Sequence, residues 1–305
     1  MHLKKFNVSH DREIGYYRVG TGGSPIVFVH AQSTSSESYF EVVKKLSANH
    51  QIYLLDCYGH GGSSHRPGLY HLQKIGDDMI KLINDLIGVP VTLVGHSSGG
   101  LIAAYIASKS NCCAKLILED APFFASQGDR RFNTYNYVDL STVCHNFLLQ
   151  KKETDFVLYY FKNQYAWNFF PEKNRHKMKQ KLVASAERYR RKHPDKNLKV
   201  MFWPKSALKA FYGMNQYDPR FGEAFFSDSF NQGIDYETLL SEISCPTLFL
   251  KAKTNINEEG LQLCALTDED LEKVVCLIPD CRTLRFDCGH GIHLEKPKEF
   301  LSIFS

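Results

Sequence analysis

The fold is decided by the stretch Val91-Thr92-Leu93-Val94-Gly95-His96-Ser97-Ser98-Gly99, which is followed by the apolar run Leu101–Ala107. Its β-branched start predicts a strand over 91–96, and the apolar run predicts a buried helix over 98–110. Ser97 lies at the junction, with a glycine two residues to either side. A turn this tight strains the serine backbone, lifts the hydroxyl above the strand end and leaves no room for side chains at 95 and 99. The stretch therefore predicts a nucleophilic serine; the alternative is a Ser/Gly turn that only caps the helix.

Strand-like and helix-like segments alternate at both ends of the chain. Residues 3–19 predict two antiparallel strands. Further strands are expected at 25–30, 51–56, 91–96, 115–120, 247–252 and 281–288, and helices near 37–48, 71–87, 98–110, 268–277 and 297–304. Apolar strands that alternate with amphipathic helices predict an α/β fold, with a mostly parallel, doubly wound sheet covered on both faces. Active residues are then expected at the carboxyl ends of the strands.

The alternation stops between about Ala121 and Asp235. This segment has a helical pattern, and residues 123–230 hold over half of the chain's Phe, Tyr and Trp residues. We predict a helical, aromatic-rich lid over 121–235, inserted after the sixth strand, with 1–120 and 236–305 forming the core. Its aromatic side chains are expected partly to form a small core of their own and partly to line a pocket.

The net charge of +4 is unevenly distributed along the 305 residues. Residues 171–209 hold 13 Lys and Arg against 3 Asp and Glu. Such a block can attract nucleic acid, anionic lipid or an anionic substrate. However, an apolar stripe at helical spacing within 172–192 separates the charges from a buried face: Met178, Leu182, Val183, Ala186 and Tyr189. This pattern favours a solvated helix face, so no nucleic-acid partner is expected.

Membrane insertion and a disulfide framework are also not expected. No apolar stretch approaches the roughly 20 residues that span a bilayer. The N-terminus lacks an apolar signal segment. The nine cysteines form no C-x-x-C pair, which favours reduced thiols in a cytoplasmic protein without a metal site. A homodimer is left open.

A serine nucleophile needs a base, and several histidines compete for this role. His290 follows the last expected strand and lies in a loop that leads into the final helix, Gly289-His290-Gly291-Ile292-His293. A loop in this place can reach back to the turn at Ser97. His293 is the local rival, although it suits a helix entry. His96 lies inside the turn, but its side chain is expected to point away from Ser97.

Four motifs in order resemble the α/β-hydrolase fold superfamily, in particular its lid-containing serine esterases and lipases. They cover nearly the whole chain, and the expected lid is the least similar part. The motifs are Val29-His30-Ala31 (an oxyanion loop with alanine in place of the usual glycine), Asp56-Cys57-Tyr58-Gly59-His60-Gly61-Gly62-Ser63, the turn at 95–99, and Gly289-His290 with Leu294-Glu295-Lys296-Pro297. The resemblance implies an oxyanion hole made by the backbone N–H groups of Ala31 and Ser98.

The chain departs from the family pattern at the acid that orients the base. The usual position, after the strand at 247–250, holds Asn255 or a neighbour, and Glu258 is the first carboxylate there. Asp120 is the favoured acid, because some lipases of this fold carry theirs at the corresponding strand end. The order Ser97, Asp120, His290 also fits the family order. Glu258, Glu259 and Asn255 remain alternatives as the group that orients the base. In that case Asp120 would only cap the first helical turn of the expected lid.

The resemblance implies a serine hydrolase that cleaves a small carboxyl ester through an acyl-enzyme, without metal or organic cofactor. Serine as nucleophile argues against the dehalogenase and epoxide hydrolase branches, which use aspartate. Lactone hydrolysis, C–C bond hydrolysis and perhydrolysis on the same scaffold are alternatives. A catalytically weak ligand-binding protein or receptor is the alternative from another class, because the usual acid is missing.

Overall fold

The computed structural model describes residues 1–201, 203 and 211–304. An eight-stranded sheet has the order β1-β2-β4-β3-β5-β6-β7-β8. The β1–β2 and β2–β4 pairs are antiparallel, and the remaining pairs are parallel. The strands are β1 Lys4–Ser9, β2 Arg12–Val19, β3 Pro25–Val29, β4 Gln51–Leu55, β5 Val91–His96, β6 Cys113–Glu119, β7 Thr247–Lys251 and β8 Cys281–Arg285. The expected α/β sheet is confirmed.

Helices connect the parallel strands and continue in the segment after β6. The π-helical turn Ile83–Ile87 extends α2, so the helix expected over 71–87 is present, and Gly88 ends it with φ 74°. Among the described residues, the α-helices are α1 Phe40–Leu46, α2 Leu72–Leu82, α3 Ser98–Lys109, α4 Thr142–Leu149, α5 Phe156–Asn163, α6 Glu172–Lys192, α8 Pro219–Phe226, α9 Tyr236–Ser241, α10 Asp268–Leu277, α11 Ile292–Glu295 and α12 Pro297–Ser302.

Successive side chains of the central strands enter two separate apolar layers. Ile26 and Phe28 of β3 pack in one cluster with α1 and α12. Val27 and Val29 pack in the other, with α2, α3, α9 and α10. Successive side chains of a strand point to opposite faces, so a strand buried on both faces has apolar residues throughout. All five residues of β3 are buried for this reason.

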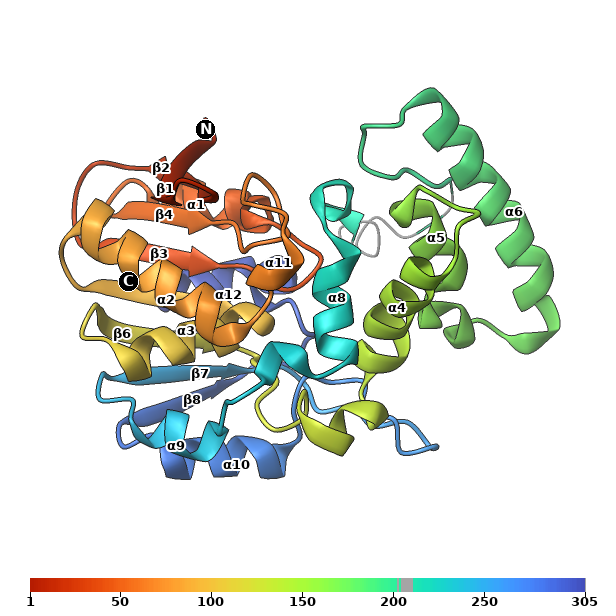
Figure 1. The fold of residues 1–305 in the computed structure, drawn as a ribbon. Helices are drawn as coiled ribbons and strands as arrows, with labels where there is room; N and C mark the ends of the chain where they lie inside the picture. The colour runs from red at the N-terminus through yellow and green to blue at the C-terminus, as the bar shows by residue number, and fades with distance from the viewer. Residues whose placement is uncertain (202, 204–210, 305) are drawn as a thin grey trace.

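The helices of residues 121–235, here called the inserted segment, lie beyond one edge of the sheet. Figure 1 shows the arrows of β3, β4 and β7 pointing toward α8 and α4, with α5 and α6 farther out. The carboxyl ends of the parallel strands therefore face the inserted segment. Whether this segment acts as a lid, and whether its limits are 121 and 235, stays a prediction.

Candidate active site

Ser97 occupies a strained turn between β5 and α3. Its backbone has φ 54° and ψ −121°, a conformation that side chains rarely adopt. A Cβ at Gly95 would lie 2.3 Å from the Gly99 oxygen, and a Cβ at Gly99 would lie 2.3 Å from the Val29 oxygen. The turn thus exists only with glycine at both positions. The Ser97 N–H donates to the backbone carbonyl oxygen of Glu119 (2.9 Å), which fixes the turn against the end of β6.

His290 and Asp120 meet at the same edge of the sheet. His290 Nδ1 lies 2.8 Å from Asp120 Oδ2. The second carboxylate oxygen, Oδ1, accepts the N–H of Ala252 at 3.1 Å. The Asp120 side chain is fully buried, whereas that of His290 is 41% exposed. This contact orients the ring and leaves Nε2 as the nitrogen available to another group.

The alternative acids lie elsewhere. Asn255, Glu258 and Glu259 are all exposed, on the loop after β7. Asn257 Oδ1 accepts the N–H of Glu259, so this loop is held by its own hydrogen bonds. Among the three sequence alternatives and Asp120, the structure places Asp120 against His290.

Ala31 and Ser98 lie at the ends of two adjacent structural elements. Ala31 follows β3 and Ser98 begins α3, and both are buried. The Ala31 oxygen accepts from His30 Nδ1 (2.8 Å) and from the Thr34 hydroxyl (2.8 Å). His30 Nε2 accepts the Cys57 N–H (3.0 Å), so the ring proton is on Nδ1. Burial lowers the pKa of His30, against the opposite effect of Asp56, so the ring is neutral.

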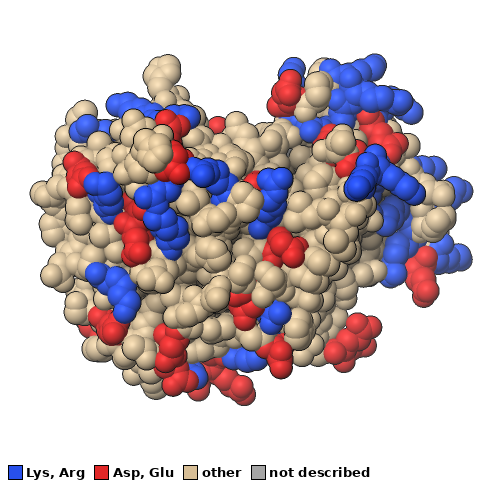
Figure 2. All heavy atoms as spheres, in the orientation of Figure 1, with Lys and Arg blue, Asp and Glu red and all other residues tan. Residues whose placement is uncertain are grey.

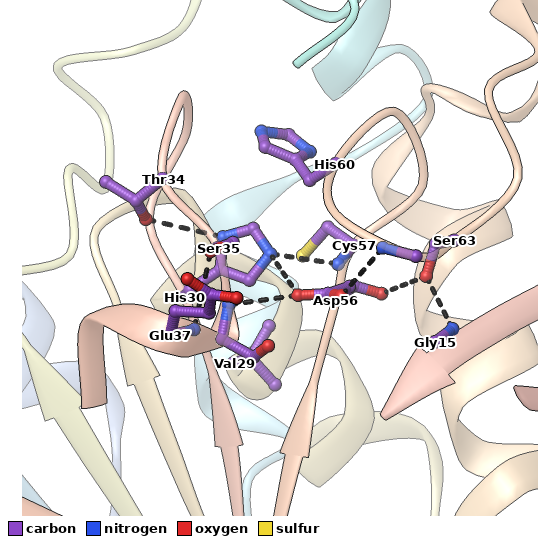
Figure 3. Close-up of polar contacts among 12 residues, drawn as sticks. Gly15, Val29, His30, Thr34, Ser35, Glu37, Asp56, Cys57, His60 and Ser63 are labelled. Carbon is purple, nitrogen blue, oxygen red and sulfur yellow. Dashed lines mark hydrogen bonds and ion pairs between the residues drawn. The ribbon is translucent and has the colours of Figure 1, made fainter. Parts of the chain in front are cut away.

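The Asp56 loop supports the loop that carries Ala31. Figure 3 shows Asp56 between His30 and Ser63, with its carboxylate directed at the neighbouring loop. Asp56 Oδ1 accepts the Ser36 N–H and Oδ2 accepts the Gly62 N–H, both at 2.9 Å. A Cβ at Gly61 would lie 2.2 Å from Asp56 Oδ2. The second sequence motif therefore has a structural role, since it ties the two loops together.

Part of the inserted segment is joined to these loops. His60 and Tyr217 form an antiparallel bridge, and the Gly61 N–H donates to the Gln216 oxygen (3.0 Å). Gln32, the residue after Ala31, donates from Nε2 to the Tyr217 hydroxyl at 3.0 Å. Neither Gln32 nor Tyr217 stood out in the sequence. Only the many aromatic residues of this segment hinted that some would face the core.

A buried polar cluster lies behind the His290 loop, and sequence analysis missed it. His293 Nδ1 and its backbone N–H both lie 2.8 Å from Glu119 Oε1. His96 Nε2 donates to the His290 oxygen at 2.9 Å. Burial favours a raised pKa for Glu119, but His293 and His96 bring it down to about 2. The Glu119-Asp120 pair and the His290-x-x-His293 spacing were the available signals.

The same three side chains are also the set that could hold a metal among the described residues. Ligand atoms of His96, Glu119 and His293 lie within 4.8 Å of one another. Two histidines and a carboxylate suit a transition metal. Hydrogen bonds already pair Glu119 with His293 and His96 with the His290 oxygen, so these contacts do not require a metal.

A surface hollow lies between the inserted segment and the loop after β7. It has a volume of about 420 Å³ and is lined by Tyr135, Phe169, Asn255 and Leu263. Other aromatic side chains pack on one another instead, with ring centroids of Phe161 and Trp167 5.3 Å apart. A second hollow, of about 650 Å³, is lined by Gln127 and residues between Ser227 and Asp235.

The basic segment forms the outermost helix. Lys and Arg side chains gather over α6 in Figure 2. Leu182, Val183 and Tyr189 are half-buried and face the core, while Lys173 and most other charges are exposed. Lys205 and Lys209 of this segment lie outside the described residues. Throughout the described part of the chain, every helix is too short or too polar to cross a bilayer.

The model of the alpha/beta hydrolase fold family matches residues 24–297. The chain belongs to this family. It is similar to solved structures of esterase RhEst1 from Rhodococcus sp. (TM-score 0.66, 19% identity, 100% of this chain and 97% of that one). It is also similar to an enol-lactonase from Burkholderia xenovorans (TM-score 0.64, 15% identity, 98% and 97%).

Sequence relatives match over a shorter stretch. One is (E)-2-((N-methylformamido)methylene)succinate hydrolase from Acinetobacter baylyi, 31% identical over 104 residues, which are 34% of this chain and 39% of the relative. Another is 3-oxoadipate enol-lactonase 2 from the same organism, 26% identical over 107 residues, which are 35% of this chain and 40% of the relative. The chain thus spans about two fifths of the length of these curated relatives.

Proposed function

We propose that this protein is a serine hydrolase that cleaves a small carboxyl ester through an acyl-enzyme. Ser97 is the nucleophile, His290 the base and Asp120 the acid that orients it. The observation that carries the proposal is the 2.8 Å contact between His290 Nδ1 and buried Asp120. It lies at the strand edge where Ser97 sits in its strained turn.

The chemistry follows from these contacts. His290 donates from Nδ1 to Asp120, so Nε2 takes the proton of the Ser97 hydroxyl as its oxygen attacks the ester carbonyl. The N–H groups of Ala31 and Ser98 hold the oxyanion. The leaving alcohol receives the proton from His290. Water then attacks the acyl group, gives its proton to His290, and the acid departs as Ser97 is restored.

The inserted segment supports a compact substrate. Its aromatic side chains, two of which (Tyr135 and Phe169) line the hollow beside Asn255, suit an apolar or aromatic acyl group of modest size. A lactone is a cyclic ester that the same steps would open. The names of the enol-lactonase relatives make lactones the second candidate substrate class.

A ligand-binding protein was the alternative from another class, because the usual acid is missing after β7. The contact of Asp120 with His290 weakens this reason, since a carboxylate is in place from the neighbouring strand. No nucleic acid is proposed as a partner, and a homodimer is left open. The nine free thiols support a reducing, cytoplasmic location.

The test compares wild-type protein with Ser97→Ala on a panel of short p-nitrophenyl esters and lactones. We expect the variant to lose at least about three orders of magnitude in kcat. Ser108→Ala, at the far end of α3, is the matched control and should keep the wild-type rate. Equal, slow rates for wild type and Ser97→Ala, with ligands that still raise Tm, would establish the binding function instead.

A further inference from the structure

Three buried polar side chains outside the proposed triad grip the loop that carries His290. His96 donates from Nε2 to the backbone oxygen of His290 at 2.9 Å. Glu119 accepts both the backbone N–H and the ring Nδ1 of His293 at 2.8 Å. With the Asp120 contact, the stretch 290–293 is held at both ends.

Two of these side chains belong to residues that directly precede a residue of the proposed triad in the sequence. His96 precedes Ser97 at the end of β5, and Glu119 precedes Asp120 at the end of β6. The Ser97 N–H also donates to the backbone carbonyl oxygen of Glu119 at 2.9 Å. Each strand end therefore presents one residue for chemistry and one that holds the loop of the base. The separation between nucleophile and base is thereby set by two adjacent strands.

The burial and polarity of the Glu119–His293 pair indicate that it does more than fill space in the core. Glu119 is 0% exposed and His293 is 2% exposed. Burying a carboxylate is costly unless it is paired and hydrogen-bonded. His293 Nε2 is buried and has no hydrogen-bond partner among the described residues, while the ring lies 4.3 Å from that of Tyr39. Only the Nδ1 side of the ring is used, and it is directed at Glu119.

We propose that Glu119, His293 and His96 are positioning residues that hold the 290–293 loop so that the His290 ring faces Ser97. The proposal rests on the proposed function, since it assigns the cluster to the geometry of that base. These contacts of Glu119, His293 and His96 are here called the clamp. The clamp has more than a stabilising role: its loss should slow each correctly folded molecule, besides lowering the number of folded molecules.

Asparagine and leucine are similar in size, so the variants His293→Asn and His293→Leu separate the hydrogen bond that His293 donates from its packing. The amide of His293→Asn can replace the Nδ1 donor, whereas His293→Leu leaves Glu119 with the backbone N–H alone. Activity is normalised to the sites labelled by a fluorophosphonate at completion. Per labelled site, we expect kcat to fall about 10- to 100-fold in His293→Leu with KM little changed. In His293→Asn, kcat should stay within about threefold of wild type.

A second pair keeps the test decisive if His293→Leu does not fold. His96→Gln retains an amide donor near Nε2, and His96→Met removes it at similar size. We expect kcat per labelled site to fall only in the methionine variant. Asp270→Asn is the stability control, because it removes the charge of buried Asp270 from its ion pair with the half-exposed Arg130 (2.7 Å), away from the proposed site. Its kcat per labelled site should be unchanged.

Three results would overturn the proposal that the clamp positions His290. One is wild-type kcat per labelled site in both donor-less variants, at a stability loss equal to that of Asp270→Asn. Another is an equal fall of kcat in the donor-retaining variants. The third is a stoichiometric metal in the purified protein that is lost in His293→Leu, which would make the cluster a metal centre. Full activity of Ser97→Ala would instead refute the proposed function itself.

Discussion

Replacing Asp120 by asparagine changes one atom of a fully buried side chain and tests the choice of acid. Oδ1 of Asp120 accepts the Ala252 N–H, and Oδ2 faces His290 Nδ1. In Asp120→Asn the amide oxygen keeps the Ala252 contact, so the NH₂ group turns toward His290. The imidazole must then carry its proton on Nε2, where it cannot accept the proton of Ser97.

The expected cost follows from this wrong tautomer. In serine triads an amide at this position lowers kcat by about 10⁴, which corresponds to about 5.5 kcal/mol of transition-state stabilisation. Folding should be retained, because an amide of the same size is easier to bury than a carboxylate. The assay is kcat on a short p-nitrophenyl ester between pH 6 and pH 9, with Tm as the check on folding.

The result that would refute this reasoning is an Asp120→Asn rate within about tenfold of wild type. Glu258→Gln and Glu259→Gln are the matched controls, because both side chains are exposed on the loop after β7. We expect each to keep the wild-type rate. A large loss in either one, with Asp120→Asn active, would move the acid to that loop.

Three further predictions concern stability and charge. A Cβ at Gly95 would lie 2.3 Å from the Gly99 oxygen, so Gly95→Ala should lower the free energy of unfolding in urea by about 3 kcal/mol or more. In the control Gly22→Ala, the new Cβ would have nothing within 4 Å and should lower it by less than about 1 kcal/mol. Equal losses in the two variants would contradict the tight packing of the turn at Ser97. Burial lowers the pKa of His96 to about 3, so its contribution to the free energy of unfolding is present above pH 6.5 and is lost as the pH falls toward 3, on the order of 5 kcal/mol in all. His96→Gln should weaken this fall of the unfolding free energy at acid pH, and an unchanged pH dependence would refute the assignment. Lys173, Lys177 and Lys181 of α6 are exposed, and replacing all three by glutamine should leave the rate of ester hydrolysis unchanged. The free energy of unfolding should shift by less than about 1 kcal/mol. DNA binding by the wild type that is lost in this variant would contradict the interpretation of α6 as a solvated helix.

Much of the fold could be predicted because it depends on local patterns. The apolar runs of β3 and β5 specify strands buried on both faces, and the two glycines around Ser97 specify a turn that excludes a Cβ. The place of His290 after the last strand follows from the topology of a parallel sheet, in which strand ends share one edge. The position of Asp120 at the end of β6 was predictable for the same reason.

The Glu119-Asp120 pair and the His290-x-x-His293 spacing hint at the clamp around His290, but its contacts could not be predicted because they join residues distant in sequence. Glu119 and His293 are separated by 174 residues, and His96 reaches the His290 oxygen across 194. A buried Glu-His pair has no periodicity that marks it. The contact of Gln32 with Tyr217 depends on how the inserted segment folds back onto the core, which no spacing encodes.

The measurement that tests the central claim most directly is the site of covalent labelling. Wild-type protein and Ser97→Ala are treated with a fluorophosphonate or a slowly hydrolysed p-nitrophenyl ester, digested, and analysed by mass spectrometry. We expect one stoichiometric adduct, on the peptide that contains Ser97, and none on the alanine variant. A wild-type protein that stays unlabelled while it hydrolyses esters, or an adduct on another residue that persists in Ser97→Ala, would contradict Ser97 as the nucleophile.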